Sequence, residues 1–414
     1  MSEQFFVREL PNGMALLGQH MDDVRSVAMT LALPAGAAYD PIGAEGAAAI
    51  ASEWCVKGAG NRDTRQINEA LDALGCQHNE HVRSQHLTLT AAVLDRNLPD
   101  LLPIYADIVR RPRLADETFE VCRDLTLQDL AGLEDEPARK CGLMLRERFY
   151  PWPLGRCIYG QSESLQAMTP EQAREHVRRT FGPRGAVLSV AGHIDEQQIC
   201  ELAEQAFGDW QGTQSAEVET RPAEGGTIHI HKPSAQTHLS LAFPAPTLRD
   251  GAYYPARVAE TVLSGGMSSR LFTEVREKRG LAYHVSCRYH SLRSCAGMFT
   301  YAGTKPELAQ ETFDVTVGEI RRLAEGVDAD ELERAKTQLK SALVLQGQST
   351  MSRSVSLTAD WYHLGRLRSL QEIHDAVEAV QADEVTDYLR DWPERDCTVL
   401  VIGPEPVETG ATME

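Results

Sequence analysis

An arginine and a tyrosine seven residues apart are residue types that could present hydrogen-bond donors on one surface. Arg276 lies in the stretch SSRLFTEVREKRG, and Tyr283 follows in LAYHVSCRYH. We predict a helix that begins at Ser268 or Ser269 and ends at Gly280, with Tyr283 on the following strand. A helix–turn–strand corner can bring both side chains to one surface, where both can donate hydrogen bonds to a carbonyl oxygen. On local features alone, a surface arginine beside a half-buried tyrosine is the more ordinary interpretation.

Two other clusters have residue types that could bind a ligand. In CQHNEHVRSQH, His78 and His86 would share one face of a strand and His81 would face away, so they could chelate a metal only if the segment forms a loop. In LSGGMSSRLF the expected order is helix, glycines, helix, and no strand followed by Gly-Lys-Ser/Thr is present. We therefore expect neither a metal at the histidines nor a nucleotide at the glycines.

The composition indicates a globular protein of two domains. The 414 residues are too many for one compact core and suit two domains of about 200 residues. Hydrophobic residues make up 42% and charged residues 24%, which is ordinary for globular proteins. The formal net charge of −19 argues against a basic groove for nucleic acid. It fits a well-solvated surface, or an acidic cavity that attracts basic peptides.

The cysteines and the first residues bear on the compartment. The nine cysteines are odd in number and scattered, and they include no CxxC, which favours a reducing compartment over a disulfide framework. No apolar run approaches the roughly 20 residues of a membrane helix. The opening MSEQFFVREL lacks a basic region followed by an apolar stretch. We expect a cytoplasmic protein with no membrane segment, and a periplasmic location stays open.

The order of predicted elements repeats in the two halves of the chain. The first half begins with two strands around the turn Pro11-Asn12-Gly13, and a buried helix follows in EGAAAIASEWCVKG. The stretch LALPAGAAYD in the first half is similar in sequence to LAFPAPTLRD in the second. We predict an α+β fold of two homologous domains related by internal duplication, each a mostly antiparallel sheet with helices on one face. The predicted boundaries are 1–212, a linker over 213–226 that is rich in polar residues, Pro and Gly, and 227–414.

Three stretches together carry a family resemblance. They are DPIGAEGAAAIASEWCVKGAGNRDTRQINEALDALGCQHN, LGRCIYGQSESLQAMTPEQAREHVRRTFGPRGAVLSVAGHIDEQQI and LSGGMSSRLFTEVREKRGLAYHVS. From about residue 6 to 405 the chain resembles the pitrilysin and mitochondrial-processing-peptidase family of inverted-motif zinc peptidases. In that family the buried helix of the first copy carries H-x-x-E-H. Its two histidines bind zinc from one helix face, its glutamate is the general base, and a later acidic residue completes the site.

The chain departs from this motif at every position. The resemblance aligns Ala49, Ser52 and Glu53 with His, Glu and His, and the later acidic position falls near Gln128 and Asp129. Alanine cannot ligate a metal, and serine is a poor zinc ligand. One glutamate and one aspartate give at most two ligands, fewer than the three protein ligands of a usual catalytic zinc. We expect no zinc and no general base in this chain.

The second copy keeps its part of the family's active site. The resemblance aligns Arg276 and Tyr283 with an Arg–Tyr pair that holds the substrate backbone and helps to stabilise the oxyanion. It also places Asn79 on a strand that lines the substrate channel, where an extended peptide can add to the sheet edge. Some bacterial members of the family are heterodimers in which one subunit holds the zinc and the other keeps only the Arg–Tyr pair. The resemblance thus implies a zinc-less subunit that binds peptide and assists, in trans, the zinc site of a homologous partner.

Two other functions remain open at this point. The chain could be a structural or peptide-binding subunit without a role in catalysis, as in the core subunits of the respiratory complex. It could also be a stand-alone peptidase with an unusual metal site. The substrate peptide, the pathway and the identity of a partner do not follow from the sequence.

Overall fold

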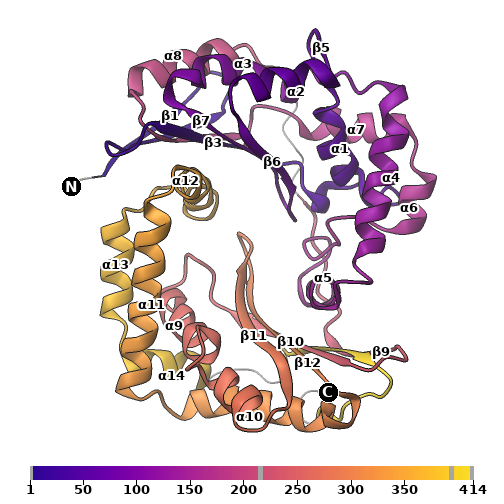
Figure 1. The fold of residues 1–414 in the computed structure, drawn as a ribbon, viewed down its shortest axis with the longest axis vertical. Helices are drawn as coiled ribbons and strands as arrows, with labels where there is room; N and C mark the ends of the chain where they lie inside the picture. Colours follow the sequence, from indigo (N-terminus) through magenta and orange to yellow (C-terminus); the bar gives the residue numbers. More distant parts are fainter. Residues whose placement is uncertain (1–2, 213–217, 391–395, 411–414) are drawn as a thin grey trace. The chain divides into compact units, whose positions relative to one another are not determined.

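The computed structural model describes residues 3–212, 218–390 and 396–410, which form two compact units, each built around one sheet (Figure 1). Unit 1 consists of Met1–Gly132, Arg156–Thr220 and Gln346–Leu367. Unit 2 consists of Leu133–Gly155, Arg221–Leu345 and Arg368–Glu414. Residues 213–217 of the predicted linker lie outside the described residues, and Gly226, its last residue, is the first of a strand.

Unit 1 has a six-stranded sheet in the order β1-β2-β8-β3-β7-β6. Its strands are β1 (Gln4–Glu9), β2 (Ala15–His20), β3 (Ser26–Leu33), β6 (Gln77–Val82), β7 (Leu87–Leu94) and β8 (Val187–Gly192), with the short pair β4 (Gly58–Ala59) and β5 (Arg62–Asp63) beside it. Its helices are η1 (Ala37–Tyr39), α1 (Ala47–Cys55), α2 (Thr64–Ala73), η2 (Asp95–Asn97), α3 (Leu98–Arg110), α4 (Asp116–Gly132), α6 (Ser162–Ala167), α7 (Pro170–Thr180), α8 (Glu196–Phe207) and α12 (Thr350–Leu364).

Unit 2 has a five-stranded sheet in the order β11-β12-β10-β13-β9. Its strands are β9 (Gly226–His231), β10 (Thr237–Ala245), β11 (Ala282–Ser291), β12 (Ala296–Thr304) and β13 (Thr398–Gly403). Its helices are α5 (Pro137–Phe149), α9 (Tyr253–Ser264), η3 (Phe272–Glu277), η4 (Pro306–Leu308), α10 (Ala309–Glu325), α11 (Ala329–Gly347), α13 (Leu370–Ala379) and α14 (Ala382–Arg390).

The two sheets confirm the predicted fold class and the internal duplication. The order β2-β8-β3-β7-β6 of the first sheet corresponds strand by strand to β9-β13-β10-β12-β11 of the second. In both sheets the first two strands of this series are parallel and every later neighbour is antiparallel. Strands β6 and β11 therefore occupy equivalent edges. Strand β6 follows α2, and β11 follows η3, so in chain order η3 corresponds to α2 and α9 corresponds to α1.

Each sheet also carries one helix contributed by the other half of the chain. Helix α12, from the second half, packs on β2, β3 and β8 of unit 1, and α5, from the first half, packs on β10, β12 and β13 of unit 2. In unit 1 the α12 side lies opposite the side covered by α3 and α8 (Figure 1). Most helices do lie on one face of their sheet, as expected, but a single exchanged helix covers part of the opposite face.

Alternation along the strands of unit 1 explains how a sheet can bind helices on both faces. Leu16 of β2 belongs to the large core shared with α2, α3 and α8. Its neighbour Leu17 points to the other face and packs with Leu357 of α12. Polar contacts add to this second layer, since the hydroxyl of Thr358 donates to the hydroxyl of Ser189 at 2.7 Å. Helix α12 is therefore part of the first folding unit although 142 residues of chain separate Phe207, the last residue of α8, from Thr350, the first residue of α12.

Reciprocal side-chain caps stabilise the starts of two helices of unit 1. Asp63 accepts from the backbone N–H of Gln66, whose side chain in turn accepts from the backbone of Asp63. Thr169 and Gln172 form the same reciprocal pair at the start of α7. Among the helices of the described ranges, none combines the length and the apolar character needed to cross a bilayer.

Leu357→Ala tests the contribution of the exchanged helix to unit 1. Leu357 is 1% exposed and packs against Leu17, Val187 and Ala191, so its truncation leaves a cavity and should lower the free energy of unfolding by about 2–5 kcal/mol. The control is Val355→Ala on the same helix, where the side chain is 39% exposed and the loss should stay below about 1 kcal/mol. Urea denaturation measures both, and equal losses would contradict the assigned role of α12.

Candidate functional site

Helix α1 carries the three positions at which the sequence lacks H-x-x-E-H. The helix is rich in alanine, and the buried carboxylate of Asp40 stabilises its start by accepting from the backbone N–H groups of Gly46 (2.7 Å) and Ala48 (2.8 Å). Ala49 is 8% exposed and Ser52 is 5% exposed. Both face protein rather than solvent, so these two positions serve the packing of the helix.

Glu53 is the one position of the altered motif that keeps a metal-binding residue type. Its Oε2 lies 3.9 Å from Nζ of Lys57, one helical turn later. Partial burial raises the pKa of Glu53 above its ordinary value, and the negative charges of Glu80 and Asp129 raise it further, while Lys57 opposes the shift. Glu53 thus lies in a small group of interacting carboxylates with one ammonium.

This donor set does not fit a catalytic zinc. Ala49 offers no donor atom, and Gln128 and Asp129 are exposed on α4. Among all residues that the structure describes, no three His, Cys, Asp or Glu side chains form a group able to hold a metal ion. A usual catalytic zinc needs three protein ligands and an open position, and the residues around α1 do not supply them.

The histidine-rich segment forms the edge of the first sheet. Asn79 is exposed on β6, which pairs with β7 at the sheet edge, and among residues 3–212, 218–390 and 396–410 no strand pairs with its other side. His78 and His86 do not share a strand face as the strand model predicts, because β6 ends at Val82 and the chain turns before β7. His78 lies 3.3 Å from Glu80, whereas the ring of His86 packs edge-on against Tyr362.

Arg276 and Tyr283 meet on the surface of unit 2. The guanidinium carbon of Arg276 lies 4.7 Å from the centroid of the Tyr283 ring and 4.8 Å from that of Phe272. The side chain of Tyr283 is 83% exposed. Within the described residues, no carboxylate lies within ion-pair distance of Arg276. A cation–π stack therefore holds this cation, and its N–H groups remain available to a ligand.

Two departures from regular backbone geometry bring this pair together. The predicted helix is confirmed in position, but residues Phe272–Glu277 are π-helical rather than α-helical, a form that recurs at functional sites. On β11, Ala282 pairs with Thr304 and His284 with Gly303, so Tyr283 is the extra residue of a β-bulge. Bulges turn a side chain away from its regular direction. Here the bulge accompanies the contact between Tyr283 and the arginine seven residues earlier.

Glu274 forms ion pairs with the other two cations of REKRG, Lys278 and Arg279. Its side chain is 10% exposed, accepts from Nζ of Lys278 at 2.7 Å and forms an ion pair with Arg279. Hydrogen bonds from these two side chains lower the pKa of Glu274 to about 2. Arg276 is thus the one cation of the segment that faces the aromatic rings instead of this carboxylate.

Phe272 and Glu274 are site residues that the sequence analysis missed. The spacing of Phe272, four residues before Arg276, is a signal that could have identified it, because side chains at i and i+4 are neighbours on a helix. The signal for Glu274 is an acidic residue in the first turn of the helical segment, followed within five residues by basic residues that it could pair with. The sequence does not show which of Arg276, Lys278 and Arg279 pairs with Glu274, because that choice depends on the π-helical geometry.

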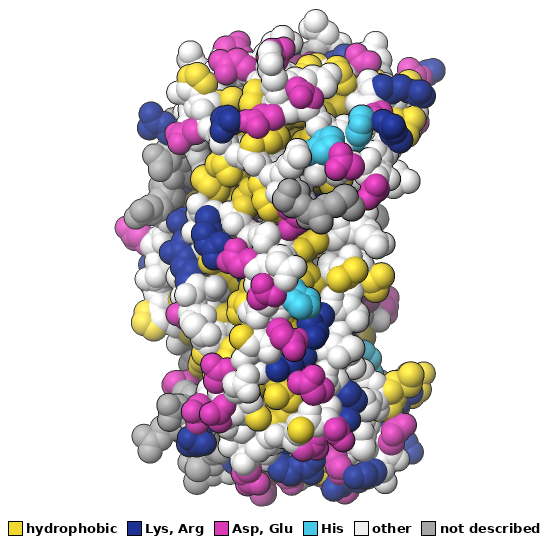
Figure 2. All heavy atoms as spheres, turned by 90° about the vertical axis from the view of Figure 1, so that its left-hand side faces the viewer, with side chains coloured by type: hydrophobic (Ala, Val, Ile, Leu, Met, Phe, Trp, Pro, Cys, Tyr) yellow, Lys and Arg dark blue, Asp and Glu magenta, His cyan; other side chains and the backbone are white. Residues whose placement is uncertain are grey.

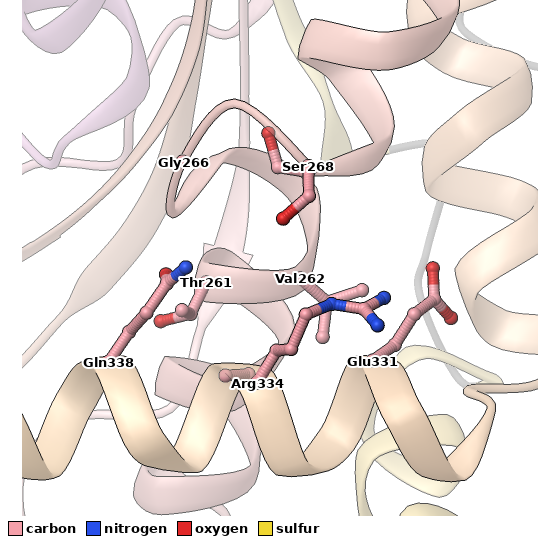
Figure 3. A pocket seen from close by; sticks show the side chains of 9 residues that line it. Thr261, Val262, Gly266, Ser268, Glu331, Arg334 and Gln338 are labelled. Carbon is pink, nitrogen blue, oxygen red and sulfur yellow. The ribbon is translucent and has the colours of Figure 1, made fainter.

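A separate small, open pocket lies at the other end of this helix–turn segment (Figure 3). It is lined by residues of α9, the following loop and α11, including Thr261, Ser268, Arg334 and Gln338. The loop contains Gly265, Gly266, Ser268 and Ser269 of LSGGMSSRLF, and it follows α9 as predicted.

Over the face in Figure 2, acidic and basic side chains are interspersed.

The chain is similar to known proteins over nearly its whole length. Residues 17–161 match the family model described as Insulinase (Peptidase family M16), and residues 167–339 match Peptidase M16 inactive domain. An uncharacterized zinc protease of Rickettsia felis is 30% identical over 411 residues, 98% of both chains. An uncharacterized zinc protease of Bacillus subtilis is 28% identical over 403 residues, 95% of this chain and 97% of the relative.

Two solved structures share the fold. One is a protease from Helicobacter pylori, with a TM-score of 0.90 and 16% identity, covering 98% of this chain and 100% of that one. The other is a peptidase M16 inactive domain from Pseudomonas fluorescens, with a TM-score of 0.87, 20% identity and 99% of each chain covered. At these identities the two structures establish the fold alone.

Glu274→Gln tests the network that fixes the cations of this segment. Because the pKa of Glu274 is lowered from 4.5 to about 2, its ionised form stabilises the folded state fully above about pH 4.5 and progressively less as the pH falls toward 2. The variant should lose about 1–3 kcal/mol of unfolding free energy at pH 7, and the difference from the native protein should shrink below pH 4.5. Urea denaturation at pH 7, 4 and 3 measures it.

The control for this experiment is Glu277→Gln, which removes an exposed carboxylate of the same segment. It should change stability by less than about 0.5 kcal/mol at every pH. If the two variants behave alike, Glu274 does not have the assigned role.

Proposed function

Because the chain belongs to the M16 peptidase family, we propose that it is the zinc-less subunit of a heterodimeric zinc peptidase. In this proposal it binds peptide and supplies Arg276 and Tyr283 to a zinc site held by a homologous partner subunit. Asn79, on the free edge of β6, contributes to peptide binding by pairing with an extended chain. The zinc and the general base belong to the partner.

One contrast between the two copies carries this proposal. In the first copy the zinc-motif positions are Ala49, Ser52 and Glu53, which cannot complete a zinc site. In the second copy Arg276 and the 83% exposed Tyr283 form a stacked pair. Burial of polar donors would indicate a structural role, whereas this pair presents its donors to solvent. This contrast supports a subunit that lacks the residues for metal chemistry and supplies residues for contact with a substrate.

The chemistry available to the pair is hydrogen bonding to a carbonyl oxygen. As a peptide bond is attacked, negative charge develops on that oxygen, and fixed donors stabilise it more strongly than they stabilise the ground state. The guanidinium supplies N–H donors and the phenol supplies one O–H donor. Packing of Arg276 between two rings reduces the freedom it would lose on binding, so its donors are oriented before the substrate arrives.

The test is peptidase activity of the chain co-expressed with a homologous subunit that carries H-x-x-E-H, sought first in a neighbouring gene. Arg276→Ala and Tyr283→Phe should each lower kcat by about 10²-fold or more, because each removes a donor to the oxyanion. Arg288→Ala, which removes an exposed arginine elsewhere on β11, is the control and should leave kcat unchanged. Complex formation is checked for every variant by size-exclusion chromatography.

The outcome separates this proposal from its alternative. If the complexes assemble and both variants retain the native rate, the pair has no catalytic role. The chain is then a structural or peptide-binding subunit of the core type.

Metal analysis of the purified chain tests the remaining alternative, a stand-alone peptidase. The donor set around α1 predicts less than about 0.1 zinc per chain after dialysis against zinc-containing buffer. Elemental analysis by mass spectrometry gives this ratio directly. A value near one that falls in Glu53→Gln would instead place a metal on this helix.

A further inference from the structure

We infer that the Arg276–Tyr283 pair prefers a peptide carboxylate over a neutral peptide carbonyl. The inference deepens the proposed function and rests on its peptide-binding part. The carboxylate could be the free C-terminus of a peptide or the side chain of an Asp or Glu within it. Both present the same planar pair of oxygens.

The first argument is the geometry of the cation. The guanidinium carbon of Arg276 lies over the rings of Phe272 and Tyr283, 4.8 Å and 4.7 Å from their centroids. With its carbon over two rings, the group offers a ligand the N–H donors at its rim. These donors form a planar fork that matches the two oxygens of a carboxylate, which can accept two parallel hydrogen bonds. A single carbonyl oxygen can use only part of this fork.

The second argument is the absence of a competing anion. Glu274 forms ion pairs with Lys278 and Arg279, and in the part of the chain that the structure describes no carboxylate lies within 4.0 Å of the Arg276 guanidinium. Phe272 and Tyr283 are neutral partners, so the stack holds the cation without neutralising it. A hydrogen bond to an ionised acceptor is about twice as strong as one to a neutral acceptor. An incoming carboxylate therefore gains more from Arg276 than a neutral carbonyl does.

The third argument is the local charge. Between residues 274 and 279 the chain has three cations and two carboxylates, in a protein of net charge −19. Glu277 is exposed, and Glu311 and Glu319 of α10 interact electrostatically with Arg279. The excess of cations along the segment, with Arg276 not ion-paired in the described residues, lowers the cost of bringing an anion to this surface.

The preference has a consequence for turnover. Hydrolysis adds one water across the peptide bond and yields one new carboxylate and one new amine. The fragment that ends in the new carboxylate should bind the pair more tightly than the same sequence with a neutral end. The subunit would then retain this product and slow its release.

Binding to the isolated chain tests the inference without a partner or a zinc. One peptide sequence is used in three forms, with a free C-terminal carboxylate, with a C-terminal amide, and with a C-terminal amide and an internal Glu. Titration calorimetry at physiological salt measures each. The free acid should bind about tenfold more tightly than the plain amide. In Arg276→Gln this ratio should fall to about one, and in Arg288→Ala it should persist.

Each result decides a separate question. Equal affinity of the acid and both amides for the native chain overturns the inference, while the kcat assay on the complex still stands as the test of the proposed function. Loss of the preference in Arg288→Ala as well as in Arg276→Gln also overturns it, because bulk charge would then be responsible. If the internal Glu restores the affinity of the amide, the pair accepts either source of carboxylate. If it does not, the C-terminal carboxylate is the ligand.

Discussion

The stacking of one guanidinium against two aromatic rings is the interaction on which the functional site depends. Arg276 contacts Phe272 and Tyr283, and the latter can reach it because η3 is π-helical and β11 has a bulge at Tyr283. Both irregularities cost hydrogen bonds that a regular helix or strand would make. Ion pairs from the exposed Lys278 and Arg279 to the buried carboxylate of Glu274 stabilise the segment and engage the two other cations near Arg276. The same short segment therefore contains both the stacked Arg276 and the ion pairs that stabilise the local fold.

The two copies of the duplicated fold share one scaffold but differ in the side chains at the candidate site. Corresponding strands occur in the same order and direction in both sheets, and β6 and β11 lie at equivalent edges. In the first copy, Ala49 and Ser52 of α1 are buried and face protein. In the second copy, Arg276 of η3 stacks on the exposed Tyr283 of β11. Exchange of α5 and α12 between the halves links the folding of both units, so neither copy is a self-sufficient sequence segment.

Much of this architecture follows from the sequence because its causes are local. The buried helix of EGAAAIASEWCVKG and the similar stretches LALPAGAAYD and LAFPAPTLRD predict the elements and the duplication. The sequence also predicts that Arg276 and Tyr283 come to one surface, and the structure brings the two side chains into contact. The remaining features are not local. An amphipathic pattern shows that α12 has an apolar face but not which sheet buries it. The π-helix and the bulge depend on packing between η3 and β11, and the strand model of His78 and His86 was wrong because the chain turns after Val82.

The central claim is that this chain contributes a wall of an active site whose metal is held elsewhere. Photo-crosslinking in the assembled complex tests it most directly, with p-benzoylphenylalanine in place of Tyr283 and a peptide substrate whose cleavage site is known. The account predicts labelling of the peptide within about two residues of the scissile bond, since adjacent residues of an extended chain are about 3.3 Å apart. The same probe in place of Arg288 should not label that region. Labelling of the peptide from Arg288 but not from Tyr283, or from neither position in an active complex, would contradict the account.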